Sequence, residues 1–201
     1  MVLSRLTLNL NNANARRDFS NRYQLHATIK RIFEDAGSKP LWRLEETVGM
    51  QPPVLLVQTE SAPSSRALQE YDDSYALSFE TKSNELLNNL QAGDAYCFRV
   101  RANPTVTREG KRHGLVKEED QLAWLERQIS QSGNEVSQAV VSQSRREVFR
   151  KRVGGHVITL QSVLFDGVIR VHNPSQFREL VQAGIGHARG FGYGLITLMR
   201  C

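Results

Sequence analysis

Tyr23, His26 and Lys30 follow one another at helical spacing, and each can take part in proton transfer or carry positive charge. An imidazole titrates near neutral pH, so His26 can act as a general acid or base with the Tyr23 hydroxyl assisting it. Lys30 can stabilise a negatively charged transition state. These residues form a candidate catalytic group, and structural packing of the histidine and tyrosine is the alternative.

The helix that would carry this group is expected over residues 22–35, with Ser20 or Asn21 as its N-cap. The apolar residues that define its buried face are Leu25, Ile29, Ile32 and Ala36. Because a helix turns by about 100° per residue, the candidate group lies along the flank of that face.

A second candidate site is a glycine-rich run near the C-terminus, with five glycines in the eleven positions 184–194. Glycine lets the backbone approach a phosphate closely, and His187 and Arg189 add polar and cationic groups. A dinucleotide-binding loop is disfavoured, because the third glycine comes one position late and an apolar run follows. The candidate phosphate contacts are Gly186, His187, Arg189, Gly192 and Gly194. The alternative is a turn whose glycines only allow close packing.

Basic residues gather in two further segments, at residues 99–117 and 145–152. The second segment is expected between two strands, as a projecting arm that can enter the groove of a duplex. Phe149 within it either stacks on a base or anchors the arm, and the anchor is favoured. The candidate RNA contacts from both segments are Arg99, Arg101, Arg145, Arg146, Arg150, Lys151 and Arg152.

The overall charge agrees with a polyanionic partner, because 26 Lys and Arg outnumber 21 Asp and Glu among 201 residues. Metal catalysis has little support, since no converging carboxylates or His/Cys ligand spacing occur. We therefore expect no metal and no other cofactor. Cys97 and Cys201 are too few for a disulfide framework, and no signal peptide or membrane span is evident. These features predict a cytoplasmic protein.

Two successive halves of the chain show the same expected order of elements, βαββαβ. The first half has expected strands near 2–8, 41–44, 54–58 and 75–80, and helices near 22–35 and 64–71. The second half has expected strands near 96–101, 135–141, 156–171 and 195–199, and helices near 118–131 and 175–183. The pattern breaks at Gly93. We predict an α+β fold of two tandem ferredoxin-like (RRM-like) domains, residues 1–90 and 95–201.

The chain resembles the CasE family, the CRISPR RNA-processing endoribonucleases of the type I-E Cascade complex. The matching segments are YQLH at 23–26, FRVRANP at 98–104, QLAWL at 121–125, VLFDG at 163–167 and the glycine-rich run through Leu195. The resemblance implies tandem ferredoxin-like domains that cut the repeat hairpin of precursor CRISPR RNA without metal. The implied products carry 2′,3′-cyclic phosphate and 5′-hydroxyl ends.

By matching position, His26 resembles the catalytic histidine of the family, and Tyr23 resembles a tyrosine found beside it in some members. Residues 145–152 stand in the place of the family's hairpin-gripping arm, and residues 184–194 in that of its glycine-rich loop. Lys30 is favoured over Arg31 as the basic residue, because Arg31 points about 100° further round the helix. The resemblance further implies that the enzyme keeps its guide RNA and joins the other Cascade subunits, with no membrane partner.

Two other functions remain as alternatives. The first is a non-catalytic RNA-binding module of the same fold, in which His26 and Tyr23 only pack. The second is a metabolic enzyme for a phosphorylated small molecule. The two separate basic segments fit a long polyanion better than such a small ligand. A strong loss of binding with rising salt would distinguish RNA from a small ligand.

Overall fold

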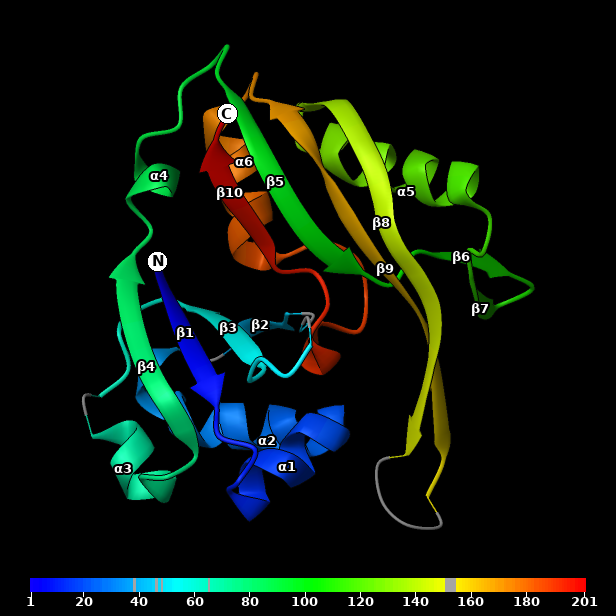
Figure 1. The fold of residues 1–201 in the computed structure, drawn as a ribbon. Coiled ribbons are helices and arrows are strands. Elements are labelled where there is room, and N and C mark those ends of the chain that lie inside the picture. The colour runs from blue at the N-terminus through cyan, green and yellow to red at the C-terminus, as the bar shows by residue number, and fades with distance from the viewer. Residues whose placement is uncertain (38, 46, 48, 65, 151–154) are drawn as a thin grey trace. The chain divides into compact units, whose positions relative to one another are not determined.

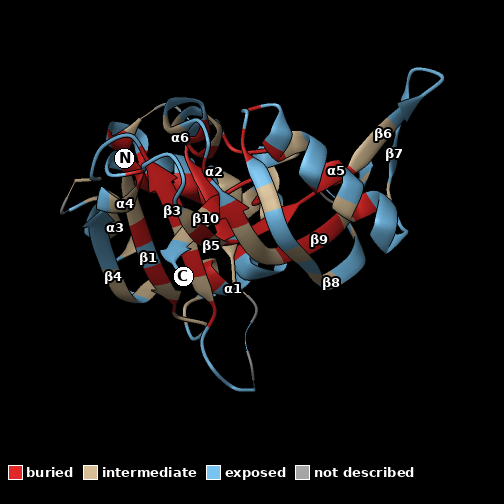
Figure 2. Cartoon of the chain, turned by 90° about the horizontal axis from the view of Figure 1, so that it is seen from above, coloured by how far each residue is buried: buried red, intermediate tan, exposed pale blue. Residues whose placement is uncertain are grey.

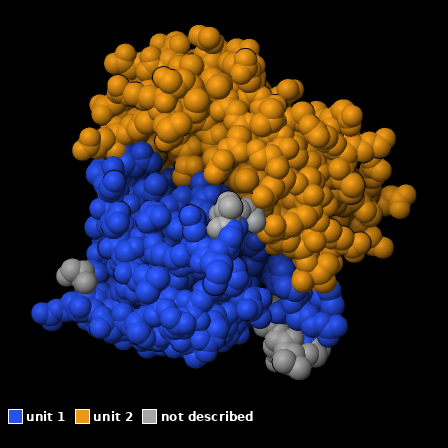
Figure 3. Space-filling model, in the orientation of Figure 1, with its two compact units in different colours: residues 1–84, 149–157, 190–192 blue, residues 85–148, 158–189, 193–201 orange. Residues whose placement is uncertain are grey.

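The computed structural model describes residues 1–37, 39–45, 47, 49–64, 66–150 and 155–201. The chain divides into two compact units, which Figure 3 colours separately. Unit 1 contains Met1–Asn84, Phe149–Val157 and Gly190–Gly192, and unit 2 contains Glu85–Val148, Ile158–Arg189 and Tyr193–Cys201. The boundaries of the two predicted domains, 1–90 and 95–201, stay a prediction.

Unit 1 is built on a four-stranded sheet with the order β2-β3-β1-β4 (Figure 1). Strand β1 pairs antiparallel with both β3 and β4, and β2 pairs antiparallel with β3. Its elements are β1 (Val2–Leu8), α1 (Ala13–Ser20), α2 (Arg22–Ile32), η1 (Glu34–Ala36), β2 (Leu41–Leu44), β3 (Val54–Thr59), α3 (Ala67–Asp72) and β4 (Ala76–Ser83). This order of strands is that of a ferredoxin-like fold, which confirms the predicted fold class for the first half.

The core of unit 1 forms where the sheet meets α2. Along β1 the side chains alternate, so that Leu6 and Leu8 are fully buried while Arg5 is exposed. Leu25 and Ile29 of α2 are buried in the same apolar cluster. Each such side chain stabilises the fold by about 1.5–3 kcal/mol relative to an exposed position. Figure 2 shows the buried positions running along β1.

Two α-helices precede β2, where the sequence predicted one. Asn12 accepts a hydrogen bond from the Ala15 backbone N–H at 3.0 Å and thereby caps α1. Helix α1 was not predicted, and it forms because Ala and Arg after such a cap are good helix formers. Asn21 caps α2 by accepting from the backbone N–H groups of Tyr23 and Gln24 at 3.0 and 3.4 Å. One of the two predicted caps is therefore confirmed.

Unit 2 repeats the topology with the sheet order β10-β5-β9-β8. Its elements are α4 (Glu85–Asn88), β5 (Ala95–Ala102), β6 (Thr105–Arg108), β7 (Lys111–Gly114), α5 (Glu118–Ser130), β8 (Glu135–Arg150), β9 (Val157–Arg170), α6 (Pro174–Ala183), η2 (Arg189–Phe191) and β10 (Ile196–Arg200). The last residues of β8, the first of β9 and part of η2 belong to unit 1. Within the described part of the chain, no helix is both long and apolar enough to cross a membrane.

Two features of the second half differ from the prediction. Strand β8 continues to Arg150 instead of ending near residue 141, because its side chains keep alternating in burial and β9 pairs with it. The basic segment at 145–150 is thus strand and not loop. The hairpin of β6 and β7 was not predicted. Its turn at Glu109 and Gly110 has positive φ at both residues, 51° and 73°, which glutamate rarely adopts.

Candidate functional site

Helix α2 carries all three residues of the predicted catalytic group. Leu25 and Ile29 face the core, whereas Tyr23 is 39% exposed, Lys30 is exposed and His26 is half-buried. Residues three and four positions apart lie on the same side of a helix, so His26 has Tyr23 on one side and Lys30 on the other. Arg31 lies over the ring of Tyr71, with its guanidinium carbon 5.3 Å from the ring centre. That contact agrees with the choice of Lys30 over Arg31.

The two ring nitrogens of His26 lie in different surroundings. Nδ1 accepts a hydrogen bond from the indole N–H of Trp42 in β2, at 3.4 Å. A Cβ atom placed on Gly190 would lie 3.3 Å from Nε2, so the glycine backbone passes close to that nitrogen. Burial lowers the pKa of His26 below its ordinary value, and the positive charge of Lys30 lowers it further. Both effects favour the neutral form of the His26 ring.

The segment Gly190–Gly192 is held against α2 and β2. Gly192 has a φ of +86°, and a Cβ there would lie only 2.5 Å from Cζ3 of Trp42. Glycine is required at this position both by the backbone conformation and by the indole. Arg22 of α2 donates a hydrogen bond to the Phe191 carbonyl at 3.4 Å. The neighbours of His26 thus come from three separate parts of the sequence.

The end of β8 reaches the same helix. Asn21 donates a hydrogen bond to the Arg150 carbonyl at 3.4 Å. Phe149 packs edge-to-face against Phe191, with ring centres 5.0 Å apart. This contact favours the anchoring role predicted for Phe149. The side chain of Arg150 is exposed.

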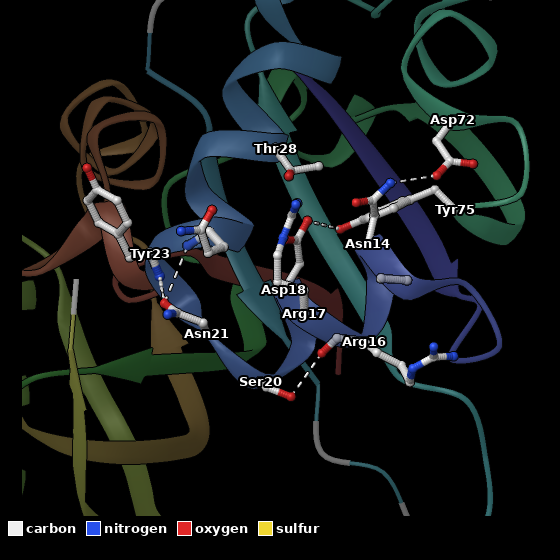
Figure 4. A network of polar contacts seen from close by, with 12 residues as sticks. Asn14, Arg16, Arg17, Asp18, Ser20, Asn21, Tyr23, Thr28, Asp72 and Tyr75 are labelled. Atoms are coloured by element: carbon white, nitrogen blue, oxygen red, sulfur yellow. Dashed lines mark hydrogen bonds and ion pairs between the residues drawn. The ribbon is translucent and has the colours of Figure 1, made fainter. Parts of the chain in front are cut away.

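A polar network lies around helices α1 and α2 (Figure 4). The buried carboxylate of Asp18 accepts hydrogen bonds from Tyr75 at 3.1 Å and Arg17 at 2.8 Å. Burial, with the charge of Asp18 adding to it, raises the pKa of Tyr75. In Figure 4 the ring of Tyr23 points away from this network. The network therefore fixes the helices without engaging the candidate catalytic tyrosine.

Close packing explains two glycines of the glycine-rich run in unit 2, Gly186 and Gly194. A Cβ on Gly186 would lie 2.8 Å from Cζ2 of Trp124, and one on Gly194 would lie 2.5 Å from the Ile185 carbonyl oxygen. Gly194 also donates a backbone hydrogen bond to the Arg101 carbonyl at 2.7 Å. Close packing accounts for glycine at both positions, and phosphate contact stays a prediction.

The polar residues of the glycine-rich run differ in their surroundings. Arg189 donates hydrogen bonds to the carbonyls of Ala183 and Gly186 at 2.6 and 3.3 Å, so its guanidinium holds the loop to the end of α6. His187 is exposed. Desolvation lowers the pKa of His187, with smaller contributions from the charges of Arg112 and Arg189. Of these two residues, His187 is the better placed to meet a ligand.

The predicted RNA-contacting arginines fall into three groups. Arg101 is buried in unit 2 and donates to Ser162 and Gln143 at 3.1 and 3.2 Å, so its role is structural and we correct its assignment. Arg99 pairs with Asp166 at 2.7 Å and Arg145 with Glu147 at 3.1 Å, yet both guanidinium groups are about half exposed. Arg146 and Arg150, which also lie in β8, are exposed. Lys151 and Arg152 lie outside the described residues.

Sequence reasoning missed Trp42 and Gly190 as neighbours of His26. No local pattern marks either residue, because each contacts the histidine from a distant part of the chain. Among the described residues, no group of three His, Cys, Asp or Glu side chains is placed to hold a metal ion.

Comparison with known proteins shows similarity along almost the whole chain. A family model described as CRISPR associated protein matches residues 1–200. The CRISPR-associated endoribonuclease Cse3 of Thermus thermophilus is 33% identical over an alignment of 214 residues, which covers 98% of this chain and 99% of the relative. The CRISPR system Cascade subunit CasE of Escherichia coli is 30% identical over 192 residues, covering 88% and 90%. The structure of Thermus thermophilus Cse3 bound to an RNA representing a pre-cleavage complex matches with a TM-score of 0.85 at 30% identity, covering 98% of each chain.

Proposed function

Because the chain belongs to the CasE family of CRISPR-associated proteins, we propose that it is an endoribonuclease that cleaves the repeat hairpin of precursor CRISPR RNA. The observation that carries this proposal is the whole-length similarity to Cse3, which is named as a CRISPR-associated endoribonuclease. The setting of His26 supports it, since a half-buried imidazole flanked by Tyr23 and Lys30 suits proton transfer to or from a phosphodiester.

In the proposed reaction, the 2′-oxygen of a ribose bonds to the adjacent phosphorus while the bond from phosphorus to the 5′-oxygen breaks. The electron pair of the broken bond stays on the 5′-oxygen. Overall, the proton lost by the 2′-hydroxyl is matched by the proton gained at the 5′-oxygen, which leaves 2′,3′-cyclic phosphate and 5′-hydroxyl ends. The nucleophile belongs to the RNA itself, so the proposed reaction needs no metal-bound water.

Each member of the catalytic group has a proposed role in that reaction. His26 transfers a proton as general acid or base, and Tyr23 assists it through its hydroxyl group. Lys30 stabilises the extra negative charge on the phosphorane-like transition state. All three side chains come from α2, whose packing fixes their mutual spacing.

The proposed RNA contacts are the exposed cations and the glycine-rich run. Arg146 and Arg150 offer guanidinium groups for phosphates along β8. The side chains of Arg99 and Arg145 are about half exposed and can exchange their carboxylate partners for phosphate, because an ion pair near the surface is worth only about 0–1 kcal/mol. The further proposed contacts are Lys151, Arg152, His187, Arg189, Gly186, Gly192 and Gly194.

A basic surface of this kind favours affinity over turnover, so we also propose that the protein keeps its guide RNA. The E. coli relative is named as a Cascade subunit, and we propose that this chain assembles with other Cascade subunits in the same way. We place this function in the cytoplasm, where CRISPR RNA is transcribed. Cleavage with many turnovers, much faster than product release, would contradict retention of the RNA.

The proposed function is tested by incubating the wild-type protein and His26→Ala with repeat RNA from the source organism's CRISPR array in excess EDTA. Wild-type protein should cut the RNA and leave a cyclic phosphate, while His26→Ala should bind with nearly unchanged affinity and leave the RNA intact. Tight binding without cleavage by either protein would instead support the non-catalytic RNA-binding subunit. Wild-type cleavage that stops in EDTA would contradict the metal-independent mechanism.

A further inference from the structure

The contact between Trp42 and His26 restricts the chemistry of the imidazole. An indole nitrogen can only donate a hydrogen bond, so Nδ1 of His26 must accept it and must carry no proton. A neutral imidazole holds one proton, which then resides on Nε2. Were the proton on Nδ1 instead, two N–H groups would face each other within unit 1 and the hydrogen bond would be lost.

We propose that Trp42 is a positioning residue for His26, and that its indole N–H selects the neutral tautomer with the proton on Nε2. This inference takes the role of His26 from the proposed function. The tautomer itself is a property of the free protein, whether or not RNA is cleaved.

Trp42 is rigid enough to impose this choice. Its side chain is fully buried, and its backbone lies in β2 opposite Val57 of β3. The backbone of Gly192 packs against the indole ring so closely that a Cβ would overlap it. The indole therefore cannot turn away when the imidazole changes its protonation, and the histidine must adapt to the tryptophan.

The selected tautomer makes Nε2 a hydrogen donor. Gly190 passes beside Nε2 without a side chain, so no Cβ occupies the position 3.3 Å from that nitrogen. A donor at this nitrogen suits the departing 5′-oxygen, which gains negative charge as its bond to phosphorus breaks. It does not suit removal of the proton from the 2′-hydroxyl, because that role needs an unprotonated Nε2. The Nε2 proton passes to the 5′-oxygen as its bond to phosphorus breaks, the proton of the 2′-hydroxyl passes to water, and the ring regains a proton from water, so that it ends neutral.

The first test is ¹⁵N NMR of the histidine rings in the free protein at a pH where His26 is neutral. The His26 signals are assigned by their absence in His26→Ala. We expect a protonated Nε2 and an unprotonated Nδ1 in the wild type, and a mixture of both tautomers in Trp42→Phe. Trp124→Phe is the matched control, because Trp124 is buried against Gly186 in unit 2, and it should leave the His26 signals unchanged.

The second test is single-turnover cleavage of repeat RNA at saturating protein. Trp42→Phe should slow cleavage by about tenfold or more, within the roughly 10²–10⁴-fold that a positioned acid or base contributes, while RNA affinity stays within about twofold. Should Trp42→Phe fail to fold, the tryptophan analogue with sulfur in place of the indole N–H retains the packing and replaces it in both tests.

The outcomes separate this inference from the proposed function. A proton on Nδ1 in the wild type, or an unchanged tautomer after loss of the indole N–H, overturns the role of Trp42 even if the RNA is cut. Equal cleavage rates for wild type and the sulfur analogue also overturn it. Wild-type protein that shows the expected tautomer but never cleaves RNA leaves the selection by Trp42 intact and removes the proposed function.

Discussion

Each unit of this protein contains a buried tryptophan packed against a glycine with positive φ, but the two pairs differ in what the indole does. In unit 1, Trp42 faces Gly192 and donates its N–H to His26. In unit 2, Trp124 faces Gly186 and stacks on Phe165, with ring centres 6.4 Å apart. The same kind of packing therefore supports a candidate catalytic group in one unit and an aromatic contact of the core in the other.

The last α-helix before the second strand of each sheet supports the same conclusion. Helix α2 presents Tyr23, His26 and Lys30, whereas α5 begins with three acidic residues that suit its N-terminal dipole. Gln121, which is buried in α5, donates a hydrogen bond to the Leu115 carbonyl at 2.8 Å and has a structural role. Identical topology thus leaves the chemistry to individual side chains.

The strongest contrast is expected between histidines of the two units. His26→Ala should lower the cleavage rate by about 10²–10⁴-fold, because proton transfer at the departing oxygen is lost. His172→Ala is the control, since the His172 ring is exposed and pairs with Glu135 at 3.2 Å. Its cleavage rate should match the wild type. A comparable loss in both variants, measured at saturating protein, would remove the special role of unit 1.

The two glycines that face tryptophans provide a second contrast. Gly192→Ala and Gly186→Ala each place a methyl group within 3 Å of an indole at a positive φ, so each should lower the free energy of unfolding by about 1–3 kcal/mol. At saturating protein, where a weakened RNA contact at Gly186 does not limit the rate, only Gly192→Ala should also slow cleavage, by about tenfold, because it displaces the indole that donates to His26. Urea denaturation and single-turnover assays measure the two effects. Equal cleavage in both variants would show that Trp42 need not be held in place.

Two arginines of β8 and β5 test where the RNA is held. Arg150→Ala should weaken RNA binding and reduce the slope of log affinity against log salt by about 1, as expected for one lost phosphate contact. Arg101→Met should leave that slope unchanged, because the buried guanidinium of Arg101 bonds within unit 2. Filter binding over a range of salt concentrations measures both slopes. A lower slope for Arg101→Met alone would reverse our correction of its role.

The smallest expected effect concerns the charge beside His26. Burial and Lys30 both lower the pKa of His26, so the folded protein resists protonation of this ring and loses stability as the pH falls through that pKa. Lys30→Met should raise the pKa of His26 by removing the like charge, whereas the exposed Lys82→Met should not. NMR titration of the His26 ring tests this. A pKa that stays the same in Lys30→Met would indicate burial as the sole cause.

Local patterns in the sequence were sufficient for several parts of the structure. The helical spacing of Tyr23, His26 and Lys30 and the cap at Asn21 depend on neighbouring residues alone, and both were predicted. The order of strands and helices in each half followed from hydrophobic periodicity. Helix α1 and the hairpin of β6 and β7 were missed, because polar residues and a Glu-Gly turn carry weak signals.

The sequence by itself determined the two ferredoxin-like halves and the helix that carries the candidate catalytic group, because these depend on local propensity and on alternation of apolar residues. Only the tertiary structure decided that Arg101 is buried, that glycines at 186, 192 and 194 fit against indole or carbonyl groups, and that Trp42 donates to His26. Those contacts join residues far apart in the chain, and their energies arise only when the sheet and helices have packed.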